Sequence, residues 1–79
     1  MQSEKRLLLS EIKQGETATI HWIQGGKALN SRLASFGFTP GASINMTQNV
    51  GSGPLIVTVR GMRVALGRGE AARIVVERR

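Results

Sequence analysis

The segment from Arg32 to Gly41 constrains the fold of this chain more than any other part of the sequence. Three apolar residues recur here at the spacing of one helical turn. Leu29 lies just before the segment, and Leu33 and Phe36 lie within it. Because this spacing places the three side chains on one face, it predicts a short amphipathic helix over Lys27 to Phe36.

The residues after this helix stop it and turn the chain. Gly37 stands where helices commonly end in a left-handed residue. Pro40 and Gly41 match the two central positions of a type II turn, because proline fixes the first φ and glycine accepts a positive φ. Phe38 lies between the helix end and the turn, so we expect its side chain to be held in place and displayed at the surface.

Short strands are predicted over most of the remaining chain. The segments rich in β-branched residues or alternating apolar positions are Leu7–Leu9, Thr17–Ile23, Ala42–Asn49, Leu55–Val59, Met62–Leu66 and Arg73–Glu77. A flat sheet would leave edges that so short a chain cannot cover. The sequence therefore predicts a mainly β protein, a small closed or nearly closed β-barrel with one short α-helix between the first and second barrel strands. Its 79 residues form a single domain, 1–79, with a loose N-terminus, 1–6.

Local signals predict how some of these strands begin, bend and connect. Ile23 falls out of phase with the preceding apolar positions of its strand, which predicts a bulge near His21 and Trp22. Arg60–Gly61 fits a two-residue hairpin turn, with glycine where a positive φ is needed. Ser10 is expected to cap a one-turn helix.

Charge and hydropathy narrow the possible partners and the location of the protein. The net charge is +6, which favours anionic partners such as nucleic acid, acidic lipid headgroups or an acidic protein face. No apolar run approaches the ~20 residues needed to span a bilayer. Leu7–Leu9 is too short for the apolar region of a signal peptide. We therefore expect a soluble, cytoplasmic protein.

The residue types present argue against catalysis and against a resident metal or cofactor. The chain has no Cys and no Asp, and His21 is its only histidine. A catalytic constellation would have to combine a Ser with His21 and a Glu, and nothing in their spacing brings them together. A metal site usually needs three or four ligands. Gly51–Gly53 lacks the spacing of a phosphate-binding loop. We expect no catalytic residue, no metal site and no cofactor.

The order of these residues along the chain matches a known pattern. Its most specific part is Arg32-Leu33-x-x-Phe36-Gly37-Phe38-x-Pro40-Gly41, and other matching positions include Leu9-x-x-Ile12, Gly53-Pro54-Leu55, Val64-Ala65-Leu66 and Ile74-x-Val76. From Leu7 to Val76 the chain resembles the FeoA family, small cytoplasmic accessory proteins of bacterial ferrous iron uptake. The two aromatic positions more often hold Leu or Met in that family.

The resemblance implies a fold, a role and a partner. The implied fold is an SH3-like barrel, and the implied role is non-catalytic. The implied partner is FeoB, the membrane ferrous iron transporter, bound through its cytosolic GTPase region. The family is associated with transition metal ions, but partner binding alone is enough to explain a role in iron uptake.

Exposed apolar groups beside basic ones are the expected partner contacts. We predict contacts through Phe38, with Arg32 and Leu33 on the preceding helix, and secondarily through Pro54 and Leu55. Simpler roles stand beside this prediction. Leu33 fits a core position, Arg32 can pair with a Glu or cap the helix end, and Pro54 and Leu55 can simply begin a strand.

A basic nucleic-acid-binding or transcription-related module is the main alternative function. Such barrels stack bases on aromatic side chains. Once Phe36 is assigned to the core, only Trp22 and Phe38 remain for stacking, so no nucleic acid is expected. An aromatic-lined groove for proline-rich peptides is less well supported still. Pairing of Ala42–Asn49 with a second copy would give a homo-oligomer, and the sequence leaves that possibility open.

Overall fold

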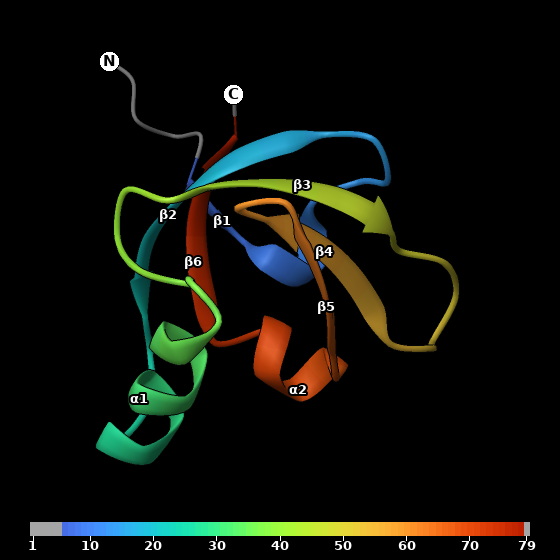
Figure 1. Cartoon of the computed structure of the whole chain (residues 1–79). Coiled ribbons are helices and arrows are strands. Elements are labelled where there is room, and N and C mark those ends of the chain that lie inside the picture. Colours follow the sequence, from blue (N-terminus) through green and yellow to red (C-terminus); the bar gives the residue numbers. More distant parts are fainter. Residues whose placement is uncertain (1–5, 79) are drawn as a thin grey trace.

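The computed structural model describes residues 6–78 as one curled sheet with two helices and a 3-10 turn (Figure 1). The strands are β1 (Arg6–Leu8), β2 (Thr17–Ile23), β3 (Ser43–Gln48), β4 (Leu55–Val59), β5 (Met62–Leu66) and β6 (Ile74–Arg78). The helical elements are η1 (Leu9–Glu11), α1 (Lys27–Ser35) and α2 (Arg68–Ala71). Of the N-terminus expected to be loose, residues 1–5 lie outside the described part, and Arg6 begins β1.

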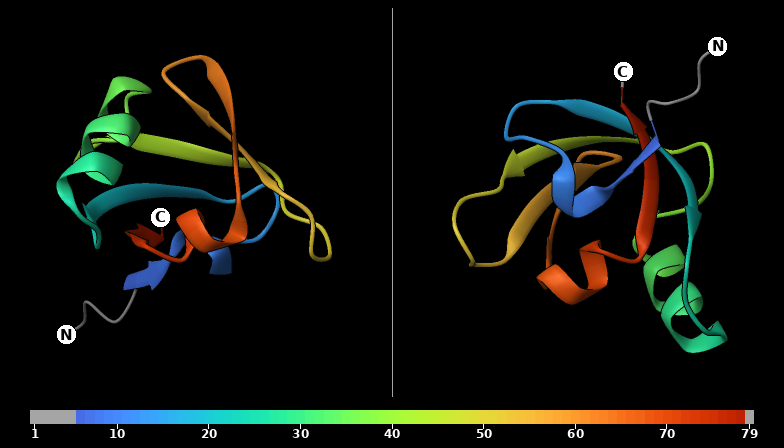
Figure 2. Two further views of the ribbon diagram at one scale, coloured as in Figure 1. Left: turned by 90° about the horizontal axis from the view of Figure 1, so that it is seen from below. Right: turned by 180° about the vertical axis from the view of Figure 1, so that it is seen from behind.

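All strand pairs are antiparallel, and the sheet order is β1-β6-β2-β3-β4-β5. The two views in Figure 2 show this sheet curling around a common interior. β1 and β5 end the hydrogen-bonded order, and η1 packs against α2 and β6. The predicted mainly β, nearly closed barrel is confirmed. Counting β1, however, α1 follows the second strand of the chain rather than the first.

The core fills the inside of the curl with aliphatic side chains and one aromatic ring. Every buried side chain in the described part of the chain is apolar. They are Leu9, Ile12, Ala18, Ile20, Ile23, Leu33, Phe38, Ile44, Met46, Leu55, Val57, Val59, Val64, Leu66, Ala71, Ile74 and Val76. Leu9, Ile12 and Ala71 come from η1, its exit and α2, so these short elements bring apolar groups where the sheet itself is not closed.

Several local predictions are confirmed. The register of β2 against β6 shifts between Ile20 and Trp22, which is the expected bulge. Arg60 and Gly61 have φ of 53° and 80°, as a hairpin turn with two left-handed residues requires. The Ala42 amide donates to the Thr39 carbonyl at 3.0 Å, which closes the turn predicted at Pro40–Gly41.

Two local predictions are wrong in detail. Ser10 does not cap a helix, because η1 already begins at Leu9. The Glu11 carboxylate instead accepts a 2.8 Å hydrogen bond from the Leu8 amide. Phe36, assigned to the core from its helical spacing, is the C-cap of α1 and is only partly buried. Phe36 packs against the core but is not enclosed by it, since α1 ends at Ser35.

The prediction that Phe38 is displayed at the surface is also wrong. Its side chain is 1% exposed. The reason lies in the helix end: Gly37 has a φ of 95°, its amide donates to Ala34, and the Phe38 amide donates to the Leu33 carbonyl at 3.0 Å. This is the Schellman motif, which brings the residue after the left-handed glycine toward the last turn of the helix. Phe38 therefore enters the core with Leu33.

Candidate functional site

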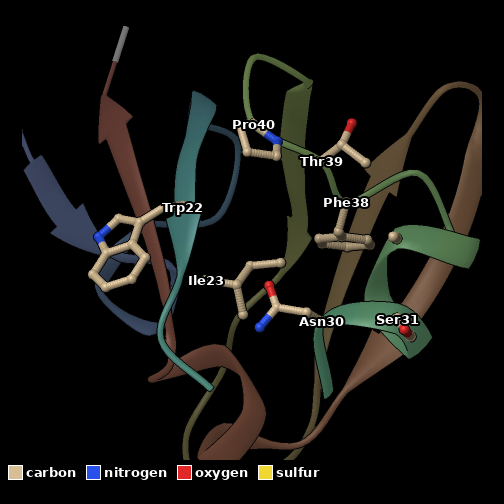
Figure 3. A pocket seen from close by; sticks show the side chains of 8 residues that line it. Trp22, Ile23, Asn30, Ser31, Phe38, Thr39 and Pro40 are labelled. Atoms are coloured by element: carbon tan, nitrogen blue, oxygen red, sulfur yellow. The ribbon is translucent and has the colours of Figure 1, made fainter. Parts of the chain in front are cut away.

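A solvent-open hollow of about 350 Å³ lies between β2, α1 and the segment that leaves α1. Its lining residues are Trp22, Ile23, Asn30, Ser31, Ala34, Phe38, Thr39 and Pro40. In Figure 3 the side chains of Ile23, Asn30 and Phe38 converge, and Pro40 and Thr39 lie above them. Phe38 thus reaches solvent only as part of this surface, with nearly all of its ring inside the protein.

Hydrogen bonds to β2 hold the upper rim of the hollow. The Gly41 amide donates to the Ile20 carbonyl at 2.8 Å, and the Ile20 amide donates to the Ala42 carbonyl at 2.9 Å. Gly41 has a φ of 92°, a conformation in which glycine is unstrained. Because the turn is closed on itself and bonded to β2 through Gly41 and Ala42, Thr39 and Pro40 are held in a defined position.

Asn30 fixes the opposite end of the hollow. Its side-chain amide donates to the carbonyl oxygens of Gly25 and Gly26, both at 3.0 Å. These bonds join the first turns of α1 to the segment that leaves β2. The hollow is therefore bounded by backbone that is tied down at both ends.

Trp22 contributes to this lining from β2, but its indole ring points away from Phe38 (Figure 3). The side chain is 52% exposed, and Trp22 pairs with Val75 of β6. The bulge in β2 accounts for this arrangement, since it lets Trp22 face outward while the adjacent Ile23 faces the core. The exposed ring and the hollow lie on different sides of β2.

Arg32 pairs with Glu70, one of the roles foreseen for it. Its guanidinium donates to the Glu70 carboxylate, which joins α1 to α2. The Arg32 hydrogen bond, followed by that from the Gly67 amide, lowers the pKa of Glu70 below its ordinary value. Arg32 is about half exposed, so the pair is a surface brace between the two helices.

The predicted contact residues do not form one site. Leu33 and Leu55 are both 0% exposed, so both are core residues, and Leu55 begins β4. Pro54 is exposed, but it lies in the β3–β4 loop, which is on the far side of the molecule from α1 in both Figures 1 and 2. Of the predicted set, Phe38 alone lines the hollow.

Three lining residues of the hollow and one bridging asparagine were not predicted from the sequence. Ile23, Ala34 and Pro40 line the hollow because of how β2 and α1 pack, which no local spacing reveals. Asn49 joins three segments: its amide donates to the Ile12 carbonyl at 2.7 Å, and its carbonyl oxygen accepts from Arg68 at 2.7 Å. A lone Asn at a strand end gives too weak a signal to predict this bridge.

The residue types and helix lengths of the described part of the chain, 6–78, bear on function. This part contains no group of three or more His, Cys, Asp or Glu side chains placed to hold a metal ion. Within the same part of the chain, no helix has the length and apolar character needed to cross a membrane.

Comparison with known proteins places this geometry in a family. The model of the FeoA domain matches residues 7–78. An Fe(2+) transport protein A from Methanocaldococcus jannaschii is 35% identical over 69 residues, which cover 87% of this chain and 83% of the relative. A crystal structure of an iron uptake regulatory protein, FeoA, superposes with a TM-score of 0.89 at 36% identity, covering 94% of this chain and 99% of the other.

A further FeoA structure connects the family to the fold. FeoA from Stenotrophomonas maltophilia, solved in complex with zinc and described as a prokaryotic SH3 domain protein, is 34% identical. Its TM-score is 0.80, with 90% of this chain and 89% of that chain covered. The SH3-like barrel implied by the sequence resemblance is thereby confirmed, and this chain belongs to the FeoA family of ferrous iron transport accessory proteins.

Proposed function

We propose that this protein is a non-catalytic, cytoplasmic accessory factor that binds the cytosolic GTPase region of a FeoB-type ferrous iron transporter and modulates it. The observation that carries the proposal is the solvent-open hollow beside α1. It is mostly apolar, its rim is tied down by backbone hydrogen bonds, and Phe38 forms part of its base. Preformed apolar hollows with a few polar groups are common sites of partner binding.

The net positive charge of the chain also supports this proposal. The chain carries a net charge of +6, which attracts an acidic face of a partner and raises the rate of encounter. A hollow filled by an apolar side chain of the partner would add binding that persists at high salt. Binding at this site modulates the transporter if one of its states binds more tightly than another. A coupling of ~1–3 kcal/mol is sufficient, and it acts reciprocally on nucleotide binding.

The test is a titration of the protein with the GTPase region of the transporter encoded nearest its gene, at low and at high salt. Ala34→Gln adds bulk to the lining of the hollow at an exposed position. Ala28→Gln makes the same change on an exposed residue of the same helix that does not line the hollow. We expect Ala34→Gln to weaken binding about tenfold and Ala28→Gln to leave it unchanged.

Equal effects of the two variants, or no binding at all, would contradict docking at the hollow. A mixed-sequence oligonucleotide serves as the competing ligand. Saturable binding of that oligonucleotide with a steep salt dependence, without binding of the GTPase region, would instead support the nucleic-acid-binding alternative. Trp22 is the only largely exposed aromatic residue in the described chain, which argues against base stacking as the main interaction.

A further inference from the structure

β5 ends the sheet order, so one of its edges has no neighbouring strand among the described residues. The two-residue turn makes Val59 and Met62, which flank it, a hydrogen-bonded pair. Hydrogen-bonded and non-hydrogen-bonded pairs alternate along an antiparallel ladder. The N–H and C=O groups of Val64 and Leu66 therefore point toward β4. The N–H and C=O groups of Arg63 and Ala65 point toward the open edge. This edge therefore offers two backbone donors and two acceptors to an added strand.

The side chains beside this edge are accessible. Met62 is 55% exposed, and Arg63 and Ala65 are also exposed. The other edge of the sheet is different, because β1 is only three residues long and its Arg6 is paired with Glu77 of β6. β5 is the longer edge and carries no ion pair in the described structure.

The charge around β5 has a single sign. The stretch 55–69 contains no acidic residue and holds three arginines: Arg60, Arg63 and Arg68. The next acidic residue, Glu70, is already paired with Arg32. Arg68 donates to Asn49, and the stem of Arg60 packs over Gly37. The Arg63 side chain has no hydrogen-bond or ion-pair partner among the described residues.

We propose that the open edge of β5 binds an extended acidic segment of a partner protein as an additional strand. Backbone groups of Arg63 and Ala65 would hold the segment, and an acidic side chain on its outer face would pair with Arg63. A second copy of this chain is a poor occupant of the same edge, because pairing two β5 strands would bring their arginines together. The inference concerns a second surface and does not depend on docking at the hollow.

The experiment uses the full chain and a short synthetic peptide of alternating glutamate and valine as the probe. Two-dimensional NMR follows the backbone amides during the titration, and amide exchange is compared with and without the peptide. We expect the largest shifts on β5 and slower exchange at Arg63 and Ala65. A peptide of the same composition with N-methylated backbone is the control for pairing, and it should not produce this protection.

Two variants and their controls complete the test. Arg63→Glu should weaken peptide binding about tenfold, whereas Arg73→Glu, an equal charge change at an exposed position on the α2–β6 connection, should have little effect. Ala65→Pro removes one free donor and should also weaken binding. The proposal is overturned if the shifts lie outside β5, if the N-methylated peptide binds equally, or if Arg73→Glu matches Arg63→Glu. It is also overturned if added peptide leaves β5 amides unchanged or if the protein pairs with itself through β5 in sedimentation measurements.

Discussion

The connection between α1 and β3 and the hairpin between β4 and β5 both reverse the chain with glycines at positive φ, yet their surroundings differ. In the first, amides and carbonyls are bonded to α1 and β2, and Phe38 is packed inside. In the second, the turn is exposed and one edge of β5 has no neighbouring strand within residues 6–78. Similar turn chemistry thus builds a fixed rim in one place and an accessible edge in the other. The segments packed beside each turn determine whether it forms a fixed rim or an accessible edge.

The two regions should differ most in how much a large apolar side chain contributes to the free energy of unfolding. Phe38→Ala should lower the free energy of unfolding by about 3–5 kcal/mol, because it empties part of the core. Met62→Ala, at a 55% exposed residue of the hairpin, should change it by no more than about 0.5 kcal/mol. Urea unfolding followed by circular dichroism measures both values.

A loss that large can leave a small domain unfolded. Phe38→Leu therefore provides a second measurement, with an expected cost of about 1 kcal/mol because most of the buried volume remains. Similar losses for Phe38→Ala and Met62→Ala would contradict the difference in burial between the two regions.

Proline substitutions along β5 should reduce stability by different amounts at the edge paired with β4 and at the open edge. Val64→Pro removes a donor directed toward β4 and leaves an acceptor there unpaired, which should cost about 2 kcal/mol or more. Ala65→Pro removes a donor that faces solvent, a position where edge strands tolerate proline. Thermal unfolding of the two variants should therefore differ by several degrees. Equal destabilisation would mean that the backbone groups of both residues are bonded, and a larger loss for Ala65→Pro would mean that the assignment of paired and open positions is reversed.

Alanine substitutions of the two turn glycines should show a smaller difference. Gly37 and Gly61 both have positive φ, so each alanine variant carries backbone strain. At Gly37 the added Cβ would also lie 3.1 Å from the Arg60 side chain, whereas at Gly61 it meets nothing within 4 Å. We expect losses of about 2 kcal/mol for Gly37→Ala and about 1 kcal/mol for Gly61→Ala in urea unfolding. A larger loss at Gly61 would be inconsistent with this comparison.

The smallest expected effect concerns the ion pair that links α1 to the helix after β5. The pKa of Glu70 is lowered in the folded protein by Arg32, so the pair stabilises the protein above the ordinary glutamate pKa. This contribution is lost as the pH falls through the folded-state pKa. Arg32→Gln should reduce the fall in stability on the acid side, by less than about 1 kcal/mol because Arg32 is half exposed. The measurement is the free energy of unfolding of both proteins from pH 7 to below the ordinary glutamate pKa. If Arg32→Gln leaves the slope of this free energy against pH unchanged, the pair contributes nothing.

Much of the fold could be predicted from the sequence because its signals are local. The bulge in β2, the hairpin turn at Arg60–Gly61 and the left-handed helix end at Gly37 each depend on a few adjacent residues. Proline and glycine fix backbone dihedrals wherever they occur, and alternating apolar residues indicate a strand with one buried face. The resemblance to the FeoA family extended these local signals to the complete barrel.

The candidate site was much less accessible to sequence reasoning. Phe38 was assigned to the surface, although the helix end that fixes its position was identified correctly. The partner of Arg32 is Glu70, which is 38 residues further along the chain, and pattern alone does not choose among five glutamates. The hollow needs β2, α1 and the turn together.

The sequence by itself determined where this chain turns, which segments form strands, and which family it belongs to. Those properties follow from backbone preferences and from side-chain order along the chain. The tertiary structure alone decided that Phe38 points inward, that Arg32 pairs with Glu70 of α2, and that no strand of the described chain pairs with the outer edge of β5. Each of these outcomes depends on which distant segment occupies the adjacent space, because burial and pairing are properties of packed neighbours rather than of single positions.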